Sequence, residues 1–121
     1  MRHQWGPAMS KRPDWTEDEL ILALAAYRRI GPGSISKDHP EILALSELLN
    51  RLPIHPAQDR VEPFRDPDGV RRRLTYFSQL EAGQQVAGLE NYKLVWQRFG
   101  SSPAALENAA FQILAKHGVG A

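Results

Sequence analysis

The segment FRDPDGVRRRLTYFSQL, residues 64–80, combines the start signals of a helix with an apolar stripe at helical spacing. Asp66 can accept hydrogen bonds from the free backbone N–H groups of the next turn, and Pro67 suits the first helical position. The apolar side chains recur at i, i+4 and i+7, so they share one face of the helix. They are Val70, Leu74 and Phe77. The segment therefore predicts a helix that packs into a core through this face.

The remaining faces of this helix carry side chains that can bind DNA. Arg71 and Arg72 point away from the apolar stripe, and Arg73 lies along its edge, where a long side chain can bury its stem. Guanidinium groups fit phosphate oxygens, while hydroxyl and amide groups such as those of Thr75 and Gln79 can contact base edges. The predicted DNA-binding residues are Arg65, Arg71, Arg72, Arg73, Thr75 and Gln79. The alternative is an ordinary solvated surface, because a charge cluster alone is weak evidence.

The composition is that of a single soluble domain. The chain has 121 residues, of which 42% are hydrophobic, and it can bury a modest core without covalent cross-links. The absence of cysteine excludes disulfides, thiolate catalysis and Cys-ligated metal sites. No apolar run approaches the ~20 residues needed to cross a bilayer, and the N-terminus lacks the apolar region of a signal peptide. We expect a cytoplasmic protein with no cofactor and no membrane contact.

The formal net charge of +1 is low for a dedicated DNA-binding domain, so any basic patch must be local. One such group lies within residues 60–73, where acidic residues partly dilute it. The other lies in residues 1–13, which mix Gly, Pro and cations without periodicity. We therefore expect residues 1–13 to form a flexible basic arm and residues 14–121 to form one helical domain.

Four further helices are predicted from start and stop signals. Thr16 and Glu19 have the spacing of a capping box, and Asp38 and Glu41 repeat it. Ser102 precedes a proline in the pattern of another N-cap. The five expected helices cover residues 16–30, 38–50, 66–80, 89–99 and 102–117.

These elements predict an all-α fold, a compact bundle of about five helices, since no segment of useful length alternates in the way of a strand. The first three helices are compatible with a helix-turn-helix relative whose third helix is exposed. The loop of residues 53–63 is longer than the tight turn of the simplest such motif.

The sequence contains no pattern typical of an enzyme. Ser/His/Asp, H-E-x-x-H, P-loop and G-x-G-x-x-G arrangements are all missing. The carboxylates Glu17, Asp18 and Glu19 are best explained as partners of a helix dipole rather than as metal ligands. We therefore predict no catalytic residue and no metal site.

Three segments, in the same order, follow the pattern of a known family. They are DWTEDELILAL at 14–24, PEILALSELLN at 40–50 and FRDPDGV through Phe77, followed by Gly-Leu at 88–89 and WQRF at 96–99. Together they resemble the N-terminal region of bacterial, McrA-like, modification-dependent HNH restriction endonucleases. Relative to that family, Asp66 and Asp68 replace two asparagines, Arg73 replaces a lysine and Tyr76 replaces an asparagine.

The resemblance implies an accessory domain and not a nuclease. An HNH site needs histidines on a ββα hairpin that holds a metal ion, and the four histidines here are scattered without that context. We expect a non-catalytic domain that binds or positions double-stranded DNA, with or without modified bases, for an HNH-type nuclease domain in cis or in trans, as part of bacterial defence. The alternative is a protein-interaction or dimerisation module. The near-neutral charge favours that alternative, as does an apolar set in residues 102–117 that is wider than a narrow stripe.

Overall fold

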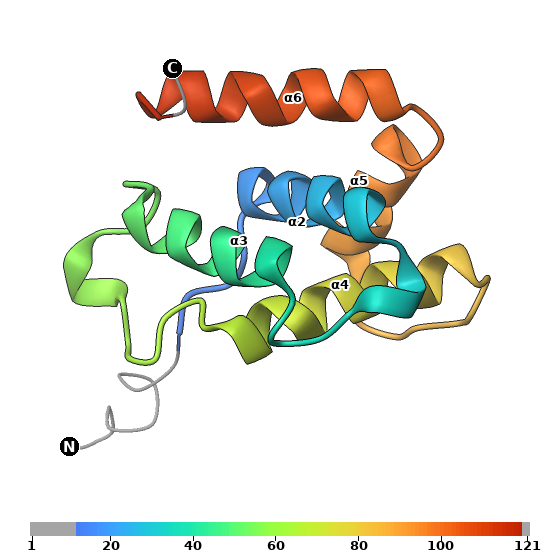
Figure 1. Cartoon of the computed structure of the whole chain (residues 1–121), viewed down its shortest axis with the longest axis horizontal. Helices are drawn as coiled ribbons and strands as arrows, with labels where there is room; N and C mark the ends of the chain where they lie inside the picture. The colour runs from blue at the N-terminus through green and yellow to red at the C-terminus, as the bar shows by residue number, and fades with distance from the viewer. Residues whose placement is uncertain (1–11, 120–121) are drawn as a thin grey trace, which may run out of the picture.

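The computed structural model describes residues 12–119 and, within this range, contains five α-helices and no strand (Figure 1). The predicted all-α bundle is confirmed. Most of the predicted basic arm, residues 1–11, lies outside the described residues. The helices are α2 (Glu17–Ile30), α3 (Pro40–Arg51), α4 (Pro67–Glu81), α5 (Glu90–Phe99) and α6 (Pro103–Lys116), with 3₁₀ turns at Pro32–Ser34 and Ala57–Asp59.

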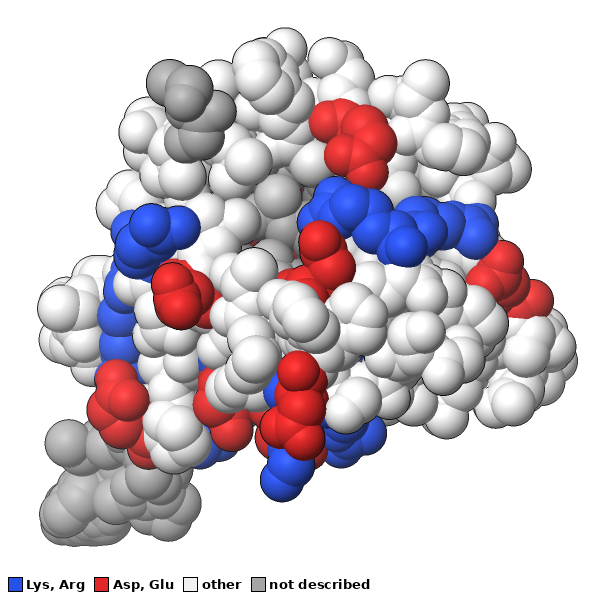
Figure 2. Space-filling model, in the orientation of Figure 1, with Lys and Arg blue, Asp and Glu red and all other residues white. Residues whose placement is uncertain are grey.

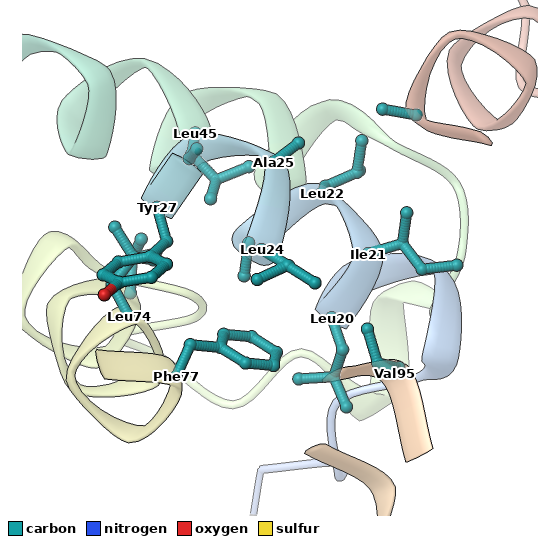
Figure 3. Packing of buried hydrophobic residues seen from close by; sticks show 14 of the residues in the cluster. Leu20, Ile21, Leu22, Leu24, Ala25, Tyr27, Leu45, Leu74, Phe77 and Val95 are labelled. Atoms are coloured by element: carbon teal, nitrogen blue, oxygen red, sulfur yellow. The ribbon is translucent and has the colours of Figure 1, made fainter. Parts of the chain in front are cut away.

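Helix α2 is the centre of the bundle and contacts all four other helices. Every residue from Glu19 to Tyr27 is buried, which is expected for a helix that is apolar on all sides. Figure 3 shows its side chains surrounded by Leu45 of α3, Phe77 of α4 and Val95 of α5. The core is therefore built around α2, and α4 is positioned by packing against it.

Two helix starts follow the prediction. The Thr16 hydroxyl accepts from the Glu19 backbone N–H at 3.2 Å, and the Glu19 carboxylate accepts from the Thr16 backbone N–H at 2.9 Å, which completes the capping box. The Asp66 carboxylate accepts from the Gly69 N–H at 3.3 Å, with Pro67 as the first residue of α4. These starts are predictable because all their partners lie within one turn.

One other predicted cap is wrong, and one is confirmed in position only. Helix α3 begins at Pro40, so His39 and not Asp38 is its N-cap, and the His39 Nδ1 accepts from the Glu41 N–H at 3.0 Å. Pro40 suits the first helical position because it lacks an N–H and has a fixed φ, and this moves the cap by one residue. Ser102 is the N-cap residue of α6, as predicted, but its side chain makes no capping hydrogen bond.

The C-terminal ends of α2, α4 and α5 are held together by polar contacts. The Tyr27 hydroxyl donates to Glu81 at the end of α4, and Arg28 pairs with the same carboxylate at 2.8 Å. Arg28 also donates to the Gly100 carbonyl, while its guanidinium carbon lies 4.8 Å from the ring centroid of Trp96. One arginine thus links three helices. Within residues 12–119 no helix has the length and apolar character needed to span a bilayer.

Gly100 ends α5, and we expect the Gly100→Ala variant to be less stable than the wild type. A Cβ atom there would lie 2.5 Å from the Trp96 carbonyl oxygen and 3.0 Å from atoms of its indole ring. Such overpacking should lower the free energy of unfolding by about 1–3 kcal/mol in urea titrations. The matched control is Gly33→Ala, because nothing lies within 4 Å of the Cβ position there. Equal urea midpoints for the two variants would contradict the prediction.

Candidate nucleic-acid interface

Arg71 and Arg72 lie on the solvent side of α4, with side chains 35% and 51% exposed. Both pair with Asp68, at 3.0 Å and 3.3 Å. Hydrogen bonds from Arg71 and then Arg72 lower the pKa of Asp68, so this carboxylate is charged at neutral pH. Because one carboxylate serves two guanidinium groups, a net positive charge remains on this turn of the helix.

Arg73 lies on another side of α4, where it faces the N-terminal segment and α5. It is half-buried, and its guanidinium carbon lies 5.1 Å from the ring centroid of Trp15. Within residues 12–119 its buried Nε–H has no hydrogen-bond partner. Tyr76, on the same edge, packs edge-on against Tyr92 of α5 with ring centroids 5.4 Å apart. Arg73 therefore lies at the edge of the buried stripe, as predicted, and Tyr76 lies on the same edge.

Thr75 and Gln79 are placed less favourably for reading bases than the sequence indicated. Both are half-buried, and the Thr75 hydroxyl donates to the Arg71 carbonyl of its own helix at 3.1 Å. Along α4 only Arg72 and Glu81 are exposed, and the other residues are half-buried or buried. The helix therefore presents a partly covered face, and not the projecting recognition helix of a simple helix-turn-helix motif.

Arg65 does not belong to the exposed face, and its predicted role as a surface phosphate contact is wrong. The residue is 3% exposed, and its Nε lies 2.8 Å from one carboxylate oxygen of Glu19. An Nη of the same guanidinium lies 3.1 Å from the other oxygen, so the pair is bidentate. The backbone of Arg65 has φ +48°, an uncommon conformation for a residue other than glycine.

The environment of this ion pair keeps Arg65 in that conformation. The Ser46 hydroxyl donates to the Arg65 carbonyl at 2.7 Å, and the His55 Nε2 lies 2.9 Å from the Glu19 carboxylate. Arg60, which the sequence placed in the same basic group, is also used internally. It donates to the carbonyls of Asn50 and Leu52 at the end of α3, at 2.6 Å and 2.5 Å. Two of the five arginines in residues 60–73 therefore stabilise the fold.

The carboxylate of Glu19 is ionised in this site although it is buried. Burial alone raises its pKa, but hydrogen bonds from Arg65, His55 and the Thr16 backbone, together with the Arg65 charge, bring the pKa below its ordinary value. A depressed carboxyl pKa stabilises the folded state above the unfolded pKa. This contribution is lost as the pH falls through the folded-state pKa.

A cavity of about 490 Å³ opens between the N-terminal segment, the start of α4 and the start of α5. Its size falls in the range of about 300–1,000 Å³ typical of small-ligand sites. Charged groups of both signs line it, including Arg12, Asp14, Arg72 and Arg73. Sequence reasoning missed this cavity, because its walls come from three segments that no local pattern connects.

The protein has no broad basic surface on the face seen in Figure 2, where acidic and basic groups alternate. This agrees with the net charge of +1. Within residues 12–119 no cluster of three His, Asp or Glu residues is arranged to bind a metal ion. No family model, no curated protein and no solved structure matches the chain. The resemblance to HNH endonucleases therefore stays a prediction from the sequence.

We expect Arg65→Met to destabilise the fold strongly, because it leaves the buried charge of Glu19 without its main partner. Removal of one member of a buried pair costs about 3–5 kcal/mol, whereas a surface pair contributes about 0–1 kcal/mol. The matched control is Arg72→Met, which removes one member of the exposed pair between Arg72 and Asp68. Urea unfolding of both variants at neutral pH tests the difference. If both lose the same small amount, Arg65 does not have the structural role assigned to it.

Proposed function

We propose that this chain is a non-catalytic accessory domain that binds or positions double-stranded DNA through the arginines of α4. The observation that carries the proposal is that Arg71 and Arg72 share a single carboxylate at the surface. The bundle uses Arg60 and Arg65 internally, but it leaves these two side chains at the surface. In this proposal they contact the DNA backbone, where guanidinium groups bind phosphate oxygens without reading sequence.

The existing pairs with Asp68 do not prevent such contacts. Exposed ion pairs contribute only about 0–1 kcal/mol, so a phosphate oxygen can replace Asp68 at little cost. Few phosphates can be reached from one turn of a helix, and the domain carries little net charge. Binding should therefore be weak and sensitive to salt, as suits a domain that positions DNA for an attached or associated nuclease.

The proposed association with an HNH-type restriction endonuclease, and hence with a cytoplasmic defence system, is supported by the sequence pattern alone. Its three segments fall at the capping box of α2, along α3 and at the start of α4. These are the parts of the chain that position the α4 arginines. A head domain of this kind would leave cleavage to a separate ββα-metal domain.

We expect Arg71→Ala/Arg72→Ala to weaken binding of a fluorescent DNA duplex by about tenfold or more, equivalent to about 1.4 kcal/mol. Loss of two phosphate contacts should also reduce the slope of log K against log salt by about 1.8. The measurement is fluorescence anisotropy at two salt concentrations, with unmodified and cytosine-methylated duplexes. A methylation preference would add recognition of modified DNA.

The control for this experiment is Arg51→Ala/Arg98→Ala, which removes the same charge from exposed positions on α3 and α5. Equal losses in both double variants would show that net charge, and not the α4 face, determines binding. Absence of binding at low salt by folded wild-type protein would refute the proposed function.

A second candidate function is dimerisation, favoured by two large apolar side chains at the surface. Phe111 of α6 and Leu94 of α5 are each 60% exposed, although Leu106 and Ile113 of α6 are buried in the core. On this alternative the wild type is a dimer in light scattering at micromolar concentration, and Phe111→Ser is a monomer because it removes apolar contact area. A monomeric wild type would remove the support for this alternative.

A further inference from the structure

Most charged groups around the cavity beside α4 already have partners. Arg65 pairs with Glu19, and Arg72 pairs with Asp68. The Asp66 carboxylate accepts from the first turn of α4. These groups shape the cavity wall, but their charges are largely satisfied without a ligand.

Apart from Asp66, whose carboxylate accepts from a backbone N–H, four groups in the cavity lack a charged side-chain partner among residues 12–119. Among the described residues, Arg12 donates only to the backbone carbonyl of Pro63, at 2.5 Å, and Arg73 forms no ion pair. Neither the Asp14 carboxylate nor the Tyr92 hydroxyl has a hydrogen bond in this range. Residues 1–11 contain no acidic side chain that could neutralise the two arginines. The cavity therefore offers two guanidinium groups, the Asp14 carboxylate and one hydroxyl, beside the carboxylates of Asp66, which caps α4, and Glu90, which pairs with Lys93.

Arg73 is held in place by an aromatic contact and not by an acid. Its guanidinium carbon lies 5.1 Å from the ring centroid of Trp15, and that of Arg65 lies 4.9 Å from the same ring. Cation–π contact orients the guanidinium without neutralising its charge. Burial raises the pKa of Tyr92, so its hydroxyl is protonated at neutral pH and can donate a hydrogen bond.

We propose that this cavity binds one phosphorylated nucleoside unit, with Arg12, Arg73 and the Tyr92 hydroxyl on the phosphoryl oxygens and Asp14 on a donor of the nucleoside. The phosphoryl group supplies acceptors for the guanidinium groups. Sugar hydroxyl and base amino groups supply donors for the carboxylate. An anion without such donors would leave Asp14 unpaired beside it, which is unfavourable in a partly enclosed site.

The nucleotide can come from two sources, a nucleic-acid strand or the free nucleotide pool, and both share this chemistry. The site goes beyond the proposed duplex contact, which rests on Arg71 and Arg72. Arg71 does not line the cavity. Anisotropy with a duplex and titration with a nucleotide therefore fail or succeed separately.

The test is a titration of the full ¹⁵N-labelled chain, followed in ¹H–¹⁵N spectra that include arginine Nε–H signals. The probes are thymidine 5′-monophosphate, thymidine, inorganic phosphate and a short oligothymidylate without terminal phosphates. We expect thymidine 5′-monophosphate to shift the Arg73 Nε–H signal and the amides of Asn91 and Tyr92. Thymidine and inorganic phosphate should each bind at least about tenfold more weakly than thymidine 5′-monophosphate. Shifts with the oligothymidylate assign the unit to a strand, and shifts with the mononucleotide alone assign it to a free ligand.

Variants separate binding from folding. Arg73→Gln should weaken binding of the mononucleotide by about tenfold or more. Arg51→Gln, at an exposed position on α3, should leave the binding affinity unchanged. Tyr92→Phe keeps the ring contacts with Tyr76 and Phe77 and removes only the hydroxyl, so it tests the site even if Arg73→Gln unfolds. The proposal is overturned if millimolar thymidine 5′-monophosphate leaves the cavity signals unshifted. It is also overturned if inorganic phosphate binds as tightly as thymidine 5′-monophosphate. The same holds if folded Arg73→Gln and Tyr92→Phe variants bind the mononucleotide as the wild type does.

Discussion

The structure depends on the buried ion pair between Glu19 and Arg65. Two charges removed from water are tolerated only when their geometry is strict and their remaining hydrogen-bonding groups are satisfied. Glu19 meets this demand by closing the capping box of α2 while it binds Arg65 and His55. Arg65 immediately precedes the N-cap of α4. The pair therefore fixes the first turn of α4 relative to the central helix, and with it the position of the arginines that follow.

The use of some arginines in folding decides which others are available for function. Arg65 binds a buried carboxylate, and Arg60 binds the free carbonyls at the end of α3. Arg71 and Arg72 lie four or more residues beyond the start signals of α4, and within residues 12–119 their only ion-pair partner is Asp68. A count of cations in the sequence overstates the basic surface, because it does not separate these two groups. The candidate interface consists of the arginines that the fold leaves incompletely neutralised.

Local signals in the sequence predicted the helices well, and distant contacts account for what was missed. Thr16 with Glu19 and Asp66 with Gly69 cap their helices within one turn, so spacing alone was sufficient. The assignment of Asp38 failed by one residue because Pro40 determines where α3 begins. The roles of Arg65 and of the cavity could not be predicted, since Glu19 is 46 positions from Arg65 and the cavity walls come from three segments.

The energetics of Arg73 explain how a buried donor without a partner is compatible with a stable fold. A buried donor without a partner costs about 1–3 kcal/mol, and a partly desolvated cation–π contact returns about 0.5–2 kcal/mol. The two effects nearly cancel, so Arg73 can remain beside Trp15 with its Nε–H unsatisfied. In the proposed site, this contact would orient the guanidinium before a phosphoryl oxygen binds, which would lower the cost of binding.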